Sequence, residues 1–163
     1  NSTVITDVVE VFKSKKVDCV YADLVYVKPG NLDKIVRYYN AKGFELKHFL
    51  YGHQPPHPAC FIKRDCYQKY GMYKTDYKIS ADFELLFRFF WRFGISSYHL
   101  PNTIIKMRYG GVSTKGLKST MILNSEILRA CRENGVKSNL LKIYSKYLFK
   151  VFQLINLPVK YIG

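Results

Sequence analysis

Acidic side chains are scarce in this chain of 163 residues. Only 12 Asp and Glu residues stand against 26 Lys and Arg residues, so the formal net charge is +14 at pH 7, and no acidic residue follows Glu133. Such an excess of positive charge attracts anions, among them nucleic acid, an anionic membrane surface and phosphorylated small molecules. The charge alone does not choose among these three kinds of partner.

Closely spaced cysteines are also absent. The four cysteines (Cys19, Cys60, Cys66 and Cys131) form no Cys-x-x-Cys pair, and no run of Cys and His has the spacing of zinc ligands. Isolated thiols in an apolar setting are typical of reduced, buried cysteines, so we expect a cytoplasmic protein. No signal peptide, internal repeat or low-complexity tract is recognisable.

The chain is rich in apolar and aromatic residues. Hydrophobic residues make up 48% of the sequence and aromatic residues 16%, a composition that excludes a disordered chain. The length suits one domain, or part of one, with a core of its own.

The apolar pattern predicts a mixture of helices and strands. Residues 17–27 form a β-branched and aromatic run that is apolar on both faces, as expected of an inner strand. Turn residues at 28–31 predict that the chain returns as a strand at 34–39. Further strands are expected at 59–63, 95–100 and 103–109, and helices at 3–14, 44–51, 65–70, 80–93, 117–133 and 139–155.

The expected helix at 80–93 carries charged residues among aromatic ones. Glu84, Arg88 and Arg92 recur every four positions, which predicts one solvated stripe with an ion pair between Glu84 and Arg88. Asp82 lies about 200° away from Glu84 around the helix, on the side of the core face. Asp82 is either a first-turn acid that faces water and complements the helix dipole, or a general base at the rim of a cleft.

Four blocks of the sequence carry a resemblance to a known family. They are His-Pro-Ala-Cys-Phe-Ile-Lys-Arg at 57–64, Tyr-Gly-Met-Tyr at 70–73, Ile-Ser-Ala-Asp-Phe-Glu-Leu at 79–85 and Arg-Tyr-Gly-Gly-Val-Ser at 108–113. In order and spacing they resemble the second half of a family 2 inverting glycosyltransferase of GT-A fold, over residues 4–135. Such bacterial enzymes build capsule, exopolysaccharide or lipopolysaccharide. The resemblance implies an α/β fold: the C-terminal part of a Rossmann-like GT-A domain, with a mixed sheet, flanking helices and a C-terminal amphipathic helix.

The resemblance also assigns roles to individual residues. It implies that Asp82 is the base that deprotonates the acceptor hydroxyl, and that His57 lies near the nucleotide-sugar donor. Gly110, Gly111 and Ser113 belong to a loop similar to one that closes over the donor diphosphate. Two further residues are added to the expected substrate site: Arg108 as a phosphate partner and Glu84 as a neighbour that assists Asp82 if it lies in the cleft.

A divalent metal, Mg²⁺ or Mn²⁺, is expected for the full-length enzyme of this family. The main ligands of this metal in the family are a pair of Asp residues in the nucleotide-binding first half of the domain. We expect that half before Asn1 and treat it as a partner of this chain. No metal ligand is therefore predicted within these residues. Asp23 matches an acid of the following strand and not the metal-binding pair. A carboxylate within a strand needs hydrogen-bond partners, so Asp23 is expected either to be structural or to support a neighbouring site residue. His48 and His99 are expected to be structural.

The C-terminal segment, residues 136–163, is expected to form a basic amphipathic helix after the acceptor-side region at 1–135. Lys142, Lys146 and Lys150 share one face of it, and the segment is too short and too often charged to span a bilayer. It is either an interfacial anchor on an anionic membrane or a helix packed on its own protein with the lysines outward.

The sequence therefore predicts an enzyme that transfers a sugar from a nucleotide-sugar donor to a saccharide or lipid-linked acceptor, in the cytoplasm or peripherally at the inner face of the plasma membrane. Two alternatives without catalysis remain, a nucleic-acid-binding module and a peripheral membrane module. Against nucleic acid, the basic residues are spread along the chain and no nucleic-acid-binding motif is recognisable.

Overall fold

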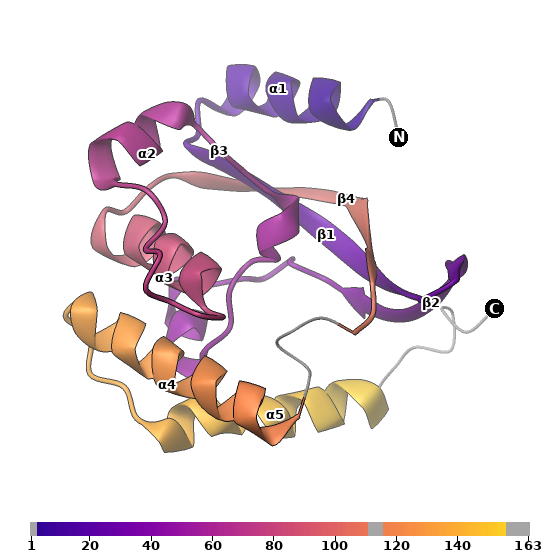
Figure 1. Cartoon of the computed structure of the whole chain (residues 1–163). Coiled ribbons are helices and arrows are strands. Elements are labelled where there is room, and N and C mark those ends of the chain that lie inside the picture. The colour runs from indigo at the N-terminus through magenta and orange to yellow at the C-terminus, as the bar shows by residue number, and fades with distance from the viewer. Residues whose placement is uncertain (1–2, 111–115, 156–163) are drawn as a thin grey trace.

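Strand β1 (Cys19–Lys28) is the centre of a four-stranded mixed sheet. The computed structural model of the chain describes residues 3–110 and 116–155. Strand β4 (Ser97–Arg108) runs parallel to β1 along one edge, and the other edge is shared by β3 (Cys60–Ile62) and β2 (Asn31–Tyr39), both antiparallel to β1 (Figure 1). The prediction of an α/β fold with a mixed sheet and flanking helices is confirmed.

The two faces of β1 contribute to two separate cores. Val20 and Ala22 pack with Val8 of helix α1 (Val4–Lys15) on one face. Cys19 and Tyr21 join a larger core on the other face. Because successive side chains of a strand point to opposite faces, burial on both sides confirms the prediction that this segment is an inner strand.

The other helical segments of the described residues surround the sheet, and most of them lie on the face opposite α1 (Figure 1). These segments are η1 (Leu46–Tyr51), η2 (His57–Ala59), α2 (Arg64–Tyr70), α3 (Ala81–Phe87) with its π-helical continuation η3 (Arg88–Arg92), and the pair α4 (Leu117–Glu133) and α5 (Leu140–Ile155). The predicted helix at 80–93 is thus present, with its last turn widened. The predicted bounds 117–133 of α4 are confirmed.

Strand β4 corrects one prediction. Two strands separated by a turn at Pro101 and Asn102 were expected, but β4 is continuous. Its register against β1 shifts where Leu100 lies opposite Ala22 and Thr103 opposite Asp23, so the two intervening residues form a bulge. An edge strand tolerates proline at a bulge because no ladder hydrogen bond is needed there, and pairing with β1 overrides the local turn signal.

Helix α5 packs against η1 and α4. Ile143 is fully buried, and the Ser138 hydroxyl donates a hydrogen bond to the Leu50 carbonyl at 3.0 Å. Lys142 is exposed, but Lys146 is only 3% exposed. Of the two alternatives for this helix, the one with its lysines outward does not hold at Lys146, because this position faces Gly52 at the end of η1. The side chain of Lys150 lies outside the described residues.

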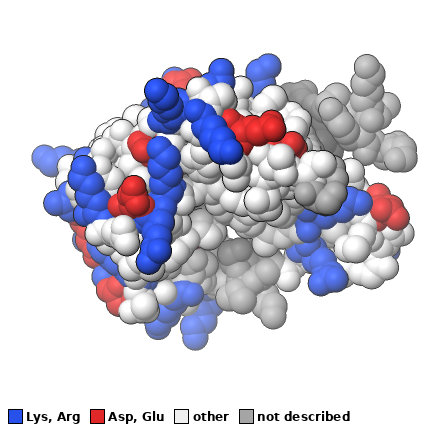
Figure 2. Space-filling view, turned by 90° about the horizontal axis from the view of Figure 1, so that it is seen from above, with Lys and Arg blue, Asp and Glu red and all other residues white. Residues whose placement is uncertain are grey.

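Basic side chains occupy several separate places on the surface. Viewed from the side of α1, the Lys and Arg side chains of the described residues form several groups with acidic residues between them (Figure 2). No helix in the described part of the chain combines the length and apolar character needed to cross a bilayer. All four cysteines are free thiols, and only Cys60 among them is not fully buried.

Candidate functional site

Asp82 lies in the first turn of α3 with its carboxylate partly exposed. One carboxylate oxygen accepts a hydrogen bond from Gln54 Nε2 at 2.9 Å, and the other accepts from the backbone N–H of Phe83 at 2.8 Å. Both donors orient the carboxylate and leave lone pairs free, since each carboxylate oxygen can accept two hydrogen bonds. The geometry is therefore compatible with a base that takes a proton from a bound hydroxyl.

Gln54 is a site residue that the sequence did not reveal. It lies in the loop before η2, where Tyr39 of β2 donates a hydrogen bond to its backbone carbonyl at 2.7 Å. Its side-chain Oε1 is buried and has no hydrogen-bond partner among the described residues, so the side chain acts on the site through its Nε2 donor to Asp82. The only sequence signal was the shape of the loop, set by Pro55 and Pro56.

His57 and Tyr73 form the second part of the site. His57 Nε2 and the Tyr73 hydroxyl share a hydrogen bond, and their rings meet edge to face with centroids 5.8 Å apart. Burial raises the pKa of Tyr73; a hydrogen bond with Tyr67 opposes the shift, and the nearby charge of Asp82 adds to it. Helix η2, which begins with His57, packs against α3, which carries Asp82 25 positions later in the sequence. Tyr73, to which the sequence gave no role, joins this region through His57.

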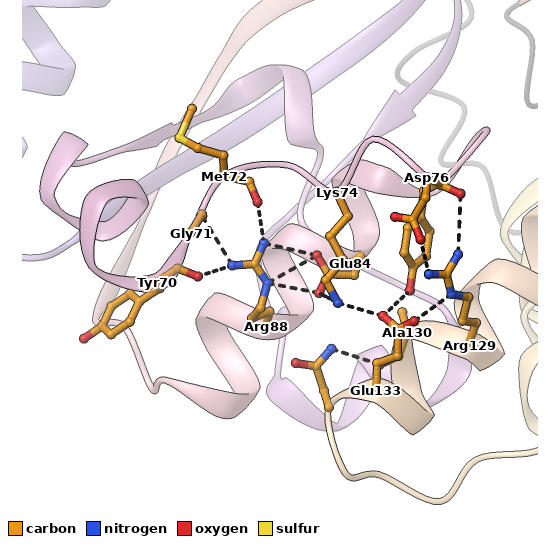
Figure 3. A network of polar contacts seen from close by, with 12 residues as sticks. Tyr70, Gly71, Met72, Lys74, Asp76, Glu84, Arg88, Arg129, Ala130 and Glu133 are labelled. Atoms are coloured by element: carbon orange, nitrogen blue, oxygen red, sulfur yellow. Dashed lines mark hydrogen bonds and ion pairs between the residues drawn. The ribbon is translucent and has the colours of Figure 1, made fainter.

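Glu84 and Arg88 do not form a solvated stripe, and that prediction is wrong. Glu84 is 0% exposed and Arg88 6%. Their ion pair was predicted correctly, with Arg88 Nε 3.0 Å from Glu84 Oε1, and Lys74 Nζ lies 3.2 Å from the same oxygen (Figure 3). The stripe is covered because the segment after α2 folds over it. Of the three stripe residues, only Arg92 is exposed.

Arg88 holds that covering segment in place. Its guanidinium donates hydrogen bonds to three successive backbone carbonyls, those of Tyr70, Gly71 and Met72 (Figure 3). The next residue along the chain is Tyr73. Glu84 and Arg88 therefore act on the site through the backbone that carries Tyr73, and the Glu84 carboxylate is occupied by its two cations.

The rest of the segment is fastened to α4. The Glu133 carboxylate accepts hydrogen bonds from Lys74 Nζ at 2.7 Å, from the Tyr77 hydroxyl at 2.9 Å and from Arg129 Nε at 2.6 Å (Figure 3). Burial raises the pKa of Glu133, but these hydrogen bonds outweigh it and lower the pKa to about 2. The loop between α2 and α3 is thus held by charged contacts at both ends.

Glu126 of α4 fixes the start of α3 in a similar way. Its carboxylate accepts hydrogen bonds from the backbone N–H groups of Lys78, Ile79 and Ser80 at 2.7–2.9 Å. Burial opposes the shift, but these backbone hydrogen bonds lower the pKa of Glu126. The predicted N-cap Ser80 makes no capping hydrogen bond with its side chain; its hydroxyl donates to the Leu123 carbonyl instead. Glu126 therefore holds the residues just before the turn that presents Asp82.

Arg108 lies at the end of β4 and is exposed. It lines an open depression of about 540 Å³ that Pro58, the neighbour of His57 in η2, also borders. This depression is separate from the contacts around Tyr73. Gly110 is exposed and has a φ of 103°, whereas Gly111 and Ser113 lie outside the described residues.

Asp23 lies in the middle of β1 and is 4% exposed. Its carboxylate accepts hydrogen bonds from the Ala41 N–H at 2.8 Å, from His99 Nε2 at 2.8 Å and from the Tyr38 hydroxyl. The hydrogen-bond partners expected for Asp23 are present, and His99, for which no partner was foreseen, supplies one of the bonds. Within residues 3–110 and 116–155, no three His, Cys, Asp or Glu side chains gather in a way that would hold a metal ion. The described residues therefore provide no ligand set for the expected Mg²⁺ or Mn²⁺.

Comparison with protein family models, with curated proteins and with solved structures returns no match for this chain. The assignment of a function rests on the residues and contacts given above.

Proposed function

We propose that this chain is the acceptor-side part of an inverting glycosyltransferase in which Asp82 is the general base. The observation that carries the proposal is the arrangement of Asp82: a partly exposed residue whose carboxylate is oriented by Gln54 and by the first turn of α3, in a helix that packs against the segment carrying His57. The four sequence blocks named above support it, because two of them supply His57 and Asp82 and a third supplies Tyr73.

The proposed reaction requires one carboxylate on the acceptor side. The acceptor oxygen attacks C1 of the donor sugar from the face opposite the leaving group, and its proton moves to Asp82. The new C1–O bond forms while the C1–O bond to the diphosphate breaks, and the bonding electrons leave with the nucleoside diphosphate. Gln54 keeps one carboxylate oxygen of Asp82 in place, so that the lone pairs of the carboxylate face the hydroxyl.

The biological setting belongs to the same proposal. The donor would be a nucleotide sugar and the acceptor a saccharide or a lipid-linked saccharide of a cell-surface polysaccharide. The donor half of a GT-A domain, with its divalent metal, would complete the site.

The test is Asp82→Asn in the full-length protein, measured as transfer of labelled sugar from a panel of UDP- and GDP-sugars. We expect kcat to fall by about 10²–10⁴-fold, the usual contribution of a general base, while donor binding is kept. The matched control is Asp65→Asn, since Asp65 is also a first-turn acid, in the neighbouring helix α2, and is exposed. Equal turnover in the two variants would refute the assignment.

A second candidate function, peripheral attachment to an anionic membrane, is favoured by the surface of α4 and α5. Leu117 of α4 is 85% exposed and Leu141 of α5 is 84% exposed, and Lys142 beside Leu141 is exposed as well. Exposed leucines next to basic residues are typical of interfacial helices. This attachment is compatible with a lipid-linked acceptor.

A further inference from the structure

Two hydrogen bonds in series connect the edge strand β2 with the proposed base. Tyr39, the last residue of β2, donates its hydroxyl proton to the backbone carbonyl of Gln54 at 2.7 Å. The side chain of Gln54 in turn donates from Nε2 to one carboxylate oxygen of Asp82 at 2.9 Å. Gln54 lies 15 positions after Tyr39, and Asp82 lies 28 positions after Gln54. Only the fold brings these three residues together.

The direction of both hydrogen bonds follows from the chemistry of the groups. An ionised carboxylate only accepts hydrogen bonds, so the amide of Gln54 must present an N–H group to Asp82. A backbone carbonyl also only accepts, so the Tyr39 hydroxyl must be the donor. Burial raises the pKa of Tyr39 to about 12, and the hydroxyl therefore keeps its proton at the neutral pH of an ordinary assay.

Tyr39 is a firm support because the sheet holds it. It lies opposite Leu24 of the central strand β1, and the guanidinium of Arg37 lies over its ring at 5.6 Å from the ring centroid. Groups carried by strands and helices are held more precisely than groups carried by loops. The Tyr39 hydroxyl therefore reaches the Gln54 loop from a fixed point.

Gln54 needs such a support because it lies in a loop, directly before Pro55. A residue that precedes a proline is restricted to extended backbone, but its ψ angle still varies over about 40°. The hydrogen bond from Tyr39 to the carbonyl selects one orientation within this range. The following residues, Pro55 and Pro56, are buried. The backbone of Gln54, and with it the amide that contacts Asp82, is thus held from both sides.

We propose that Tyr39 is a positioning residue for the base: it holds Gln54 so that the Gln54 amide orients the Asp82 carboxylate toward the acceptor hydroxyl. The inference rests on the proposed function, because this orientation serves turnover only if Asp82 is the base. Tyr39 does not touch the reacting atoms and acts through Gln54. A displacement of about 1 Å at a reacting group can lower the rate about 10²-fold, so a support that never contacts the substrate still contributes to turnover.

The first experiment observes the Gln54 amide by nuclear magnetic resonance and needs no substrate. In the full-length protein with isotope-labelled glutamine, the side-chain amide signal of Gln54 is the one that disappears in Gln54→Met. We expect the exchange of its protons with water to become about fivefold faster in Tyr39→Phe, as for the loss of one hydrogen bond between neutral groups. An unchanged exchange rate would overturn the proposal.

The matched control is Tyr38→Phe. Tyr38 is the neighbour of Tyr39 in β2, and its hydroxyl donates a hydrogen bond to the buried carboxylate of Asp23. Neighbouring residues of a strand point to opposite faces, so this variant loses the same chemical group from the same strand but away from Gln54. It should leave the exchange of the Gln54 amide unchanged. Equal acceleration in Tyr38→Phe and Tyr39→Phe would show a general loosening of β2 and overturn the proposal.

The second experiment is a double-mutant cycle on the transfer of labelled sugar. We expect kcat to fall about fivefold in Tyr39→Phe and about tenfold in Gln54→Met, which loses a hydrogen bond to a charged group, with the KM of the acceptor unchanged in both. The double variant should be no slower than Gln54→Met, because Tyr39 acts through Gln54 and has nothing further to hold. Losses that multiply in the double variant, or a normal kcat in Tyr39→Phe, would overturn the proposal.

The result for Asp82→Asn separates this inference from the proposed function. If Asp82→Asn stops transfer while Tyr39→Phe keeps the kcat of the parent protein, Tyr39 is not a positioning residue and the function stands. If Asp82→Asn transfers sugar at the rate of the parent protein, the assignment of the base falls. Tyr39 then loses its role in turnover with it, even where exchange of the Gln54 amide is faster in Tyr39→Phe.

Discussion

Replacement of Arg88 by Met is the sharpest test of the buried network. Arg88 is 6% exposed, pairs with a Glu84 carboxylate that is 0% exposed, and donates to the carbonyls of Tyr70, Gly71 and Met72. Methionine fills most of the same volume but has no donor. The variant therefore leaves a buried negative charge without its main partner, a change that costs about 3–5 kcal/mol in measured cases.

The structure narrows this range. Lys74 still lies 3.2 Å from Glu84 and would compensate part of the lost charge, and the carbonyls of Gly71 and Met72 belong to exposed residues that water can reach. We therefore expect a loss at the lower end, about 3 kcal/mol of unfolding free energy. In a domain of this size that corresponds to a fall in the melting temperature of about 6–12 °C.

The control is Arg92→Met, one helical turn further along. Arg92 is exposed and lies over the Phe93 ring, so its replacement should change stability by no more than about 0.5 kcal/mol. Urea denaturation of both variants, and of Glu84→Leu alone and combined with Arg88→Met, completes a double-mutant cycle. We expect the double variant to be more stable than the sum of the single changes by about 1–3 kcal/mol. Additive losses, or an Arg88→Met variant as stable as Arg92→Met, would refute the reasoning.

Two further predictions concern α4 and α5. The pKa of Glu133 in the folded state is about 2, below its ordinary value of 4.5. Its stabilising contribution is therefore fully present above pH 4.5 and is lost as the pH falls toward 2. Over this pH range the melting temperature should fall less in Glu133→Gln than in the parent protein, and parallel curves would contradict the assignment. Leu141→Glu should reduce co-sedimentation with phosphatidylserine-containing vesicles several-fold because it places a negative charge in the exposed apolar surface of α5, whereas Ile5→Glu, an exposed position on α1, should not; equal effects would count against attachment through this surface.

The regular elements were predictable where their boundaries carry local signals. Helix α4 ends where Asn134 and Gly135 follow, and the observed Leu117–Glu133 agrees with the prediction. The β1–β2 hairpin was marked by Pro29 and Gly30, the latter with a φ of 82°. Glycine adopts such backbone angles without steric cost, so a turn at this place could be read from the residue types alone.

The burial of Glu84 was not predicted, although one signal for it was present. The spacing of Glu84 and Arg88 predicts their ion pair, but a periodic stripe does not say what covers it. The four other residues from Phe83 to Arg88 are all apolar and lie around the whole circumference of the helix. All four are buried: Phe83, Leu85, Leu86 and Phe87. A helix that is apolar on all sides is usually buried on all sides, and this criterion would have placed the charged pair inside.

The candidate site was predictable only in part. Asp82 and His57 were named because sequence blocks carry them, whereas Gln54 and Tyr73 join the site through contacts between segments that no local pattern records. Tyr73 lies in a loop without regular structure, and its position depends on Arg88 from the neighbouring helix. Such contacts between distant segments are the part of a site that a single sequence does not contain.

The reason for a charged pair inside α3 follows from the loop that it holds. Two hydrophobic residues could fill the same space and would often be as stable as a buried ion pair. Hydrophobic side chains would offer no N–H groups to the carbonyls of Tyr70, Gly71 and Met72. These carbonyls lie at and just after the end of α2, and Arg88 donates hydrogen bonds to all three. An arginine reaching out of the helix supplies several donors in one plane, and Glu84 keeps that plane fixed. The position of Tyr73, and with it the His57 contact, therefore depends on the buried pair of Glu84 and Arg88.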